Sequence, residues 1–177
     1  MRNNPHSRPI RSTVLVLCFA AGAALLAGCF ETALNLGSAD AAKVDVHYVG
    51  DWRFSWKTED GQNASADLVV RNFDGKRYYA EWKQAGEKPL RLNGFFVPVK
   101  TATFAQLTPL GEKGELSDPH LIVRVQLEGT KLVMRQLDSE FFADVNTDEG
   151  LRRKVGENLD NAKMYSVSLT GSLIGQP

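Results

Sequence analysis

Hydrophobic and polar residues alternate along much of the chain from residue 50 onward, which is the pattern of strands with one buried face. The first such segment is Asp51–Lys57. Trp52, Phe54 and Trp56 fall on one side of this predicted strand, and charged or hydroxyl residues fall on the other. Alternation of this kind is typical of an antiparallel sheet with one face against a core and one against water.

The same pattern predicts a hairpin from Ala64–Phe73 and Lys76–Lys83, joined by Asp74-Gly75. Asp-Gly between alternating segments favours a two-residue turn in which both residues have positive φ. In this pairing Leu68 and Val70 share a sheet face with inward residues of the second strand, which are Tyr78, Ala80 and Trp82.

Further strands follow on both sides of Pro98, at Leu90–Val97 and Val99–Leu107. Proline cannot donate to a strand ladder, so Pro98 predicts a bend or an edge between them. A glycine- and charge-rich loop is expected over Pro109–Pro119. The remaining predicted strands are Leu121–Leu127, Lys131–Leu137 (after a turn at Glu128-Gly129-Thr130) and Met164–Leu173.

The period changes over Asp148–Asn161, where Leu151, Val155 and Leu159 recur every four residues. This spacing predicts an amphipathic helix, with Thr147 or Asp148 as its N-cap. The predicted elements are these eight strand segments and one late helix. The predicted fold is mainly β, either a small antiparallel up-and-down β-barrel or a strongly curved sheet.

The N-terminal segment has a different pattern, with a basic stretch over residues 1–11 and an apolar run over Val14–Leu26. That run is too short to span a bilayer comfortably, as a cleavable secretion signal requires. It ends in Leu26-Ala27-Gly28-Cys29, which resembles the lipobox of bacterial lipoproteins. The resemblance implies cleavage between Gly28 and Cys29, a thioether-linked diacylglycerol on Cys29, and usually a third acyl chain on its amine. The alternative is an uncleaved membrane helix with an incidental cysteine.

The lipobox divides the chain into a signal (1–28), a lipidated Cys29 with a tether (29–46) and a single β domain (47–177). Two or more acyl chains anchor a protein stably. Phe30, where an aspartate would resemble an inner-membrane retention signal, implies the outer membrane with the domain facing the periplasm. Cys18 leaves with the signal, so the folded part has no disulfide or cysteine metal site.

Gly50-Asp51-Trp52 at the first strand, together with a helix before the last strand, resembles lipocalins. The resemblance implies a cup-shaped, lipocalin-like barrel in which Trp52 seals the closed end. The lipocalins' Thr-Asp-Tyr segment is missing before the later strands. No specific lipocalin activity is therefore carried over.

Charge excludes one class of partner. The chain has 21 basic and 21 acidic residues, and loss of Arg2, Arg8 and Arg11 with the signal leaves the mature part at 18 against 21, a net charge of −3. Nucleic-acid binding needs concentrated positive charge, so no nucleic-acid partner is expected.

Candidate chemistry is sparse, and we expect neither catalytic residues nor a metal or cofactor. His47 and His120 lack metal-ligand spacing. A nucleophile elbow is missing, and Ser139 and Ser172 have no distinguishing context. The acidic stretch could form a calcium loop or paired acids, or simply precede the helix in solvent; it comprises Glu140, Asp144, Asp148 and Glu149.

The aromatic residues are the stronger functional candidates. In a small barrel they fill the interior or line an apolar cavity. Because adjacent residues of a strand point to opposite faces, one member of each pair Phe95-Phe96 and Phe141-Phe142 must be exposed or covered by the helix or a loop. The residues that we expect to contact a ligand or partner are Trp52, Trp56, Trp82, Phe95 and Phe142.

Three functions follow from these patterns. The first is a non-catalytic, membrane-anchored envelope lipoprotein with a β-barrel binding domain, for an apolar ligand or for an envelope protein. A cavity favours the ligand, whereas a filled interior with exposed Phe95 or Phe142 favours the protein. The alternatives are an envelope hydrolase that uses His47 or His120 and a structural subunit of an envelope complex.

Overall fold

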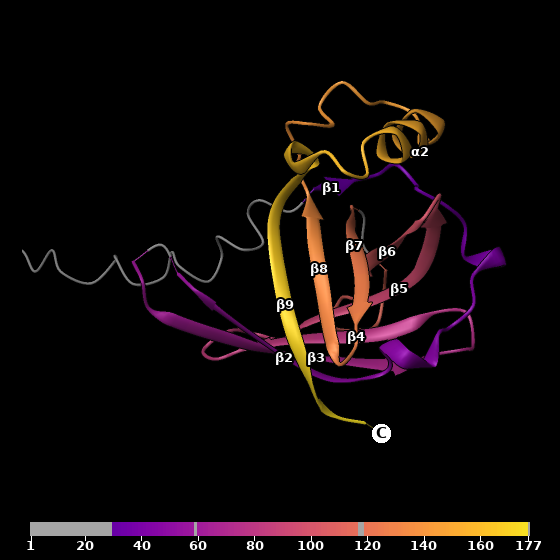
Figure 1. Cartoon of the computed structure of the whole chain (residues 1–177). Coiled ribbons are helices and arrows are strands. Elements are labelled where there is room, and N and C mark those ends of the chain that lie inside the picture. Colours follow the sequence, from indigo (N-terminus) through magenta and orange to yellow (C-terminus); the bar gives the residue numbers. More distant parts are fainter. Residues whose placement is uncertain (1–29, 59, 117–118, 177) are drawn as a thin grey trace, which may run out of the picture.

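A computed structural model describes residues 30–58, 60–116 and 119–176, so Gly28, Cys29 and the predicted signal lie outside the described residues. Within these ranges eight antiparallel strands form a closed barrel, with a two-residue strand and one helix outside it (Figure 1). This confirms the predicted mainly-β barrel. The barrel strands are β2 (Gly50–Lys57), β3 (Asn63–Asn72), β4 (Tyr78–Gln84), β5 (Leu90–Val99), β6 (Ala102–Pro109), β7 (His120–Glu128), β8 (Lys131–Leu137) and β9 (Tyr165–Gly175).

Each strand pairs with its neighbours in sequence, and β9 closes the barrel by pairing with both β2 and β8. The strand β1 (Glu31–Thr32) pairs with the first residues of β7, beside the end of the β7–β8 ladder. Connections therefore alternate between two ends of the barrel. We call the end with the β4–β5 and β6–β7 connections the open end, and the end that holds Trp52 the closed end.

The turn between β3 and β4 differs from the prediction. The β3–β4 pairing stops at Asn72 and Tyr78, so the connection has five residues and not two. Gly75 alone of the Asp74-Gly75 pair has a positive φ, of 81°. The Asp74 carboxylate instead accepts hydrogen bonds from the backbone N–H groups of Lys76 and Arg77, which fixes a wider loop.

Pro98 does not interrupt its strand. Beyond Gly94, β5 pairs with β6 alone, so the missing N–H of Pro98 costs no ladder hydrogen bond. The chain turns two residues later, where Lys100 has a φ of 52°. The eight strands of the described barrel correspond to the eight strand segments that the sequence predicted.

The helix α2 (Asp148–Glu157) begins as predicted and ends earlier. The Thr147 hydroxyl accepts a hydrogen bond from the N–H of Gly150, which confirms it as the N-cap. The helix ends at its C-cap, Asn158. Leu159 therefore lies beyond the helix, and it packs on the hydrophobic cluster beneath it. Among the described helices, none is long and apolar enough to cross a membrane.

The inward residues of all eight strands build an inner core inside the barrel. Trp52 and Phe54 are 1% and 0% exposed, and they fill the space beside β9. Gly171 is needed there, because a Cβ on it would come within 2.7 Å of the Phe54 ring. Val125 of β7 and Leu169 of β9 belong to the inner core, as alternation predicts. Tyr165, expected to point inward at the start of β9, packs instead on the outer core.

A separate outer core lies on the opposite face of the barrel wall, under α2 (Figure 1). It joins outward residues of the wall, such as Phe104 and Ile122, to Leu151 and Val155 of the helix. Phe142 is part of it, with its ring centroid 5.1 Å from that of Phe30.

The segment from Phe30 to Val46 belongs to the folded domain, in contrast to the expected tether. Phe30 and Leu36 are 7% and 1% exposed in the outer core. The N–H of Leu36 donates to the side chain of the buried Gln106 over 2.9 Å, and its carbonyl accepts from Arg152 over 2.9 Å. Apolar residues at irregular spacing gave no periodic signal, yet they cover the outer wall.

We expect Leu36→Ala to lower the free energy of unfolding by about 2–5 kcal/mol, because it opens a cavity in the outer core. Leu116→Ala is the matched control: Leu116 is 57% exposed, and its loss should change stability by less than about 0.5 kcal/mol. Urea denaturation measures both. Equal stabilities would mean that the segment before β2 is a tether after all.

Candidate ligand-binding cavity

The barrel interior is not completely filled, and it contains a cavity of about 160 Å³. Its walls are almost wholly apolar. Small side chains on adjoining parts of the wall, Ala80 and Ala105, leave the space that larger residues would occupy. Other lining residues include Leu68, Val70, Leu92, Phe96, Leu121, Val125, Leu132, Met134, Val167 and Leu169.

The residues that line the cavity are spread along the strands. Along β4 its lining runs from Tyr78 to Gln84, and at about 3.3 Å per residue these positions span up to about 20 Å. Spread along such a length, a volume of about 160 Å³ would form a slot about one hydrocarbon chain wide. The shape suits an extended group better than a broad ring system.

Aromatic residues close one end of this slot. The indole N–H of Trp52 donates to the carbonyl of Tyr48 over 3.1 Å, which holds the 3-10 turn Val46–Tyr48 across the barrel. The Tyr48 ring packs edge-on against Phe96 at 4.7 Å between centroids.

Tyr78 joins the cavity wall to the segment before β2. Its hydroxyl accepts a hydrogen bond from the N–H of Asp45 over 2.6 Å. Burial raises the pKa of Tyr78 to about 12, so the group stays a neutral phenol at physiological pH. Tyr78 therefore adds no charge to the closed end.

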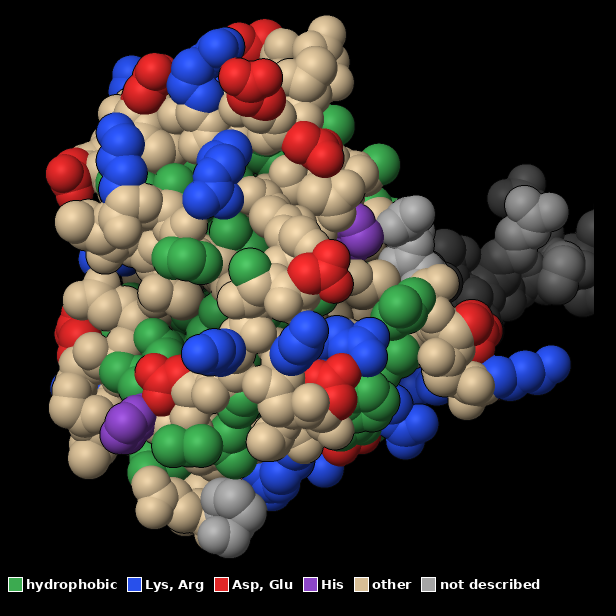
Figure 2. All heavy atoms as spheres, turned by 90° about the vertical axis from the view of Figure 1, so that its right-hand side faces the viewer, with side chains coloured by type: hydrophobic (Ala, Val, Ile, Leu, Met, Phe, Trp, Pro, Cys, Tyr) green, Lys and Arg blue, Asp and Glu red, His purple; other side chains and the backbone are tan. Residues whose placement is uncertain are grey.

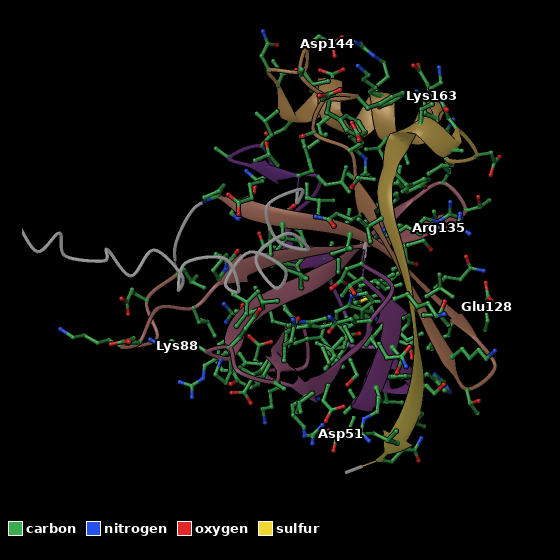
Figure 3. All side chains as sticks on the ribbon, turned by 90° about the vertical axis from the view of Figure 1, so that its left-hand side faces the viewer. Asp51, Lys88, Glu128, Arg135, Asp144 and Lys163 are labelled. Carbon is green, nitrogen blue, oxygen red and sulfur yellow. The ribbon has the colours of Figure 1, made fainter. Side chains whose placement is uncertain are left out.

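The cavity reaches solvent at the open end, beside the β4–β5 connection. Trp82 and Leu90 are half-buried there, and Glu87 is exposed. Glu87 is the one charged residue among the described residues that line the cavity. An ion pair between Lys88 and Glu112 ties this connection to the β6–β7 loop. Figure 3 shows Asp51 at one end of the barrel, with Asp144 and Lys163 of the β8–β9 connection at the other.

Gln136 is the unusual polar residue of the cavity wall. It lies on β8, opposite Val123 and Val167, and it lines the cavity near the open end. Its side-chain nitrogen Nε2 is inaccessible to solvent and has no hydrogen-bond partner in the described structure. A buried donor without a partner costs about 1–3 kcal/mol of stability.

The five aromatic residues expected to contact a ligand lie in three different places. Trp82 lines the cavity, and Trp56 stacks on it at 6.2 Å between ring centroids. Trp52 is at the closed end. Phe95 and Phe142 belong to the outer side of the wall: Phe95 is half-buried against the outer core, and Phe142 is 2% exposed within it.

The two histidines do not share a site. His47 lies in the 3-10 turn at the closed end, where its Nδ1 is 2.7 Å from Asp45 and its side chain is 79% exposed. His120 begins β7 at the opposite end, with its Nδ1 3.1 Å from the hydroxyl of Thr108. Each histidine has the polar neighbour that a hydrolase would need, but neither is among the lining residues of the apolar cavity.

The acidic stretch is divided among separate contacts. Asp144 pairs with Lys154, and this hydrogen bond lowers the pKa of the Asp144 carboxyl. Asp148 accepts a hydrogen bond from the N–H of Asn35 over 2.8 Å. Across the described ranges, no three His, Cys, Asp or Glu side chains are grouped so as to hold a metal ion.

Sequence reasoning missed Gln136 as a functional candidate, although a signal was present. In β8 the inward positions are Leu132, Met134 and Gln136, so a polar residue interrupts an apolar series on the buried face. The size of the cavity gave no such signal, because it depends on how side chains from several strands fit together.

Acidic and basic side chains are interspersed over the face shown in Figure 2, with no large field of one sign. The cavity is thus the most specific feature of the described surface and interior. Comparison of the chain with protein-family models, with curated proteins and with solved structures finds no match.

Proposed function

We propose that this protein is a lipid-anchored lipoprotein of the cell envelope whose barrel binds a small apolar ligand. The observation that carries the proposal is the apolar cavity of about 160 Å³ inside the barrel. An engineered cavity of about 150 Å³ with similar walls stays dry and binds benzene. The barrel cavity is of the size to take a comparable group, such as part of an acyl chain.

The positions of the paired phenylalanines favour a bound ligand over a contact with another protein. Phe142 is buried, and Phe95 is half-buried against the outer core, so neither offers a fully exposed aromatic surface. Phe96 points inward and lines the cavity. The hydrophobic groups that alternation placed outside the barrel are covered by the chain's own N-terminal segment and α2.

The anchor half of the proposal comes from the sequence. The basic stretch, the short apolar run and Leu26-Ala27-Gly28-Cys29 support acylation of Cys29 after cleavage. Two or more acyl chains would hold the protein stably at a membrane. Phe30 in place of aspartate supports the outer membrane, with the barrel in the periplasm.

Filling the cavity should abolish ligand retention. In native mass spectrometry of the full chain after mild extraction, we expect the wild type to carry an apolar ligand. Ala80→Leu and Ala105→Leu add bulk inside the cavity and should lose it. Ala143→Leu makes the same change at an exposed loop position and should retain it. Equal masses bound to all four proteins, or to none, would contradict the proposal.

Replacement of the two cysteines tests the anchor. Cys29→Ser should remove incorporation of radioactive fatty acid and block cleavage, because the thiol is the site of thioether formation. Cys18→Ser is the matched control within the apolar run and should be labelled like the wild type. Normal labelling of Cys29→Ser would show that the lipobox assignment is wrong.

A further inference from the structure

One polar atom beside the cavity has no hydrogen-bond partner in the described structure. Gln136 Nε2 is shielded from solvent without a partner, although the same side chain borders the cavity. A half-turn about χ3 exchanges the two amide atoms at little torsional cost, because this torsion is broad and two-fold. The NH2 group can therefore turn towards the cavity, where an acceptor on a ligand would satisfy it. The amide oxygen then takes the shielded place in the wall, and an unpaired buried oxygen is less costly than an unpaired N–H.

The walls restrict what else the ligand can be. The slot beyond Gln136 is about one hydrocarbon chain wide and is lined by Val125, Leu132 and Leu169. At the mouth, Glu87 is the charged residue among those described in the lining, and its carboxylate disfavours a second negative charge. A neutral carbonyl on an unbranched chain meets all of these conditions.

We infer that the cavity takes a single acyl chain and that Gln136 donates a hydrogen bond to its ester or amide carbonyl. This inference rests on the proposed function and specifies its ligand. Gln136 is thus a residue that selects for a carbonyl at the mouth of an otherwise apolar slot, whereas the apolar walls supply most of the binding free energy.

The position of Phe30 indicates two sources for such a chain. Phe30 belongs to the outer core and also borders the cavity, because it directly precedes β1, which pairs with the first residues of β7 at the open end. Gln136 pairs with Val123 immediately beside this point. Cys29 directly precedes Phe30 in the sequence. The acyl groups proposed for Cys29, or acyl lipids of the membrane that they enter, are therefore supplied close to the mouth.

The role of Gln136 is tested with two neutral probes of similar apolar character. One is the methyl ester of cis-parinaric acid, which has a carbonyl, and the other is diphenylhexatriene, which has none. Binding is followed by energy transfer from tryptophan, since Trp82 lines the cavity. The full chain with Cys29→Ser, held in amphipol, provides an unacylated background.

In this background Gln136→Leu should weaken binding of the ester about tenfold and leave diphenylhexatriene binding unchanged or tighter. It should also leave the fold at least as stable, because an unsatisfied donor is removed. Gln84→Leu is the matched control: Gln84 lines the same cavity, but its Nε2 already donates to Glu87 over 3.3 Å. The ratio of the two affinities should not change in this control.

An equal effect of Gln136→Leu on both probes would overturn the carbonyl assignment and leave the cavity as a purely apolar site. Absence of binding of either probe to every variant would instead refute the proposed function itself. The source is then read from acylated wild type: weak ester uptake compared with Cys29→Ser assigns the site to the protein's own anchor. Equal uptake assigns it to membrane lipids.

Discussion

Closure of the sheet by β9 is the constraint on which the structure depends. Because β9 pairs with β2 on one side and β8 on the other, the barrel has no free edge along these strands. An eight-stranded barrel encloses an interior just wide enough for side chains to fill it or to hold one small ligand. The choice between these outcomes is therefore made by side-chain size at a few inward positions.

Here the two ends of the interior are treated differently. Trp52 and Phe54 fill the closed end, and Gly171 provides the room that the Phe54 ring needs. Towards the middle, Ala80 and Ala105 leave space unfilled. A continuous packed core would contribute more stability, since voids forfeit dispersion contacts. The molecule retains a slot where larger aliphatic residues would have closed it.

The outer core compensates for part of that lost packing. It buries Leu151 and Val155 of α2 together with Phe30 and Leu36 against the outer face of the wall. A barrel wall of this kind is apolar on both faces over β5, β6 and β7, and it is held from outside while its interior stays partly empty. The outer face of these strands thus contributes packing that stabilises the fold, while their inner face borders the cavity.

The sequence predicted what depends on neighbours along the chain. Period-two alternation identified the strands and their inward faces, and Thr147 marked the start of α2. Errors arose where tertiary context decided the outcome. Pro98 is tolerated because β5 has one partner there, and Asp74-Gly75 forms a wider loop because the Asp74 carboxylate binds two N–H groups.

The candidate site was harder to predict for the same reason. Trp82 was identified from its inward position, and it does line the cavity. The predicted tether was a misreading of residues 30–46, because Phe30 and Leu36 pack on a surface that exists only after β5, β6 and β7 assemble. Gln136 was visible as a polar residue in an apolar series, but its missing partner could be recognised only from the three-dimensional surroundings.

Loss of the tether changes the expected relation between anchor and barrel. A free linker of seventeen residues would let the barrel rotate and move up to about 60 Å from the membrane. With Phe30 in the outer core, an acylated Cys29 instead leaves little freedom between the lipid and the fold. Because Phe30 also lines the cavity, such an anchor would fix the open end near the bilayer. A ligand would then pass between membrane and barrel over a short path, without exposing its apolar chain to water.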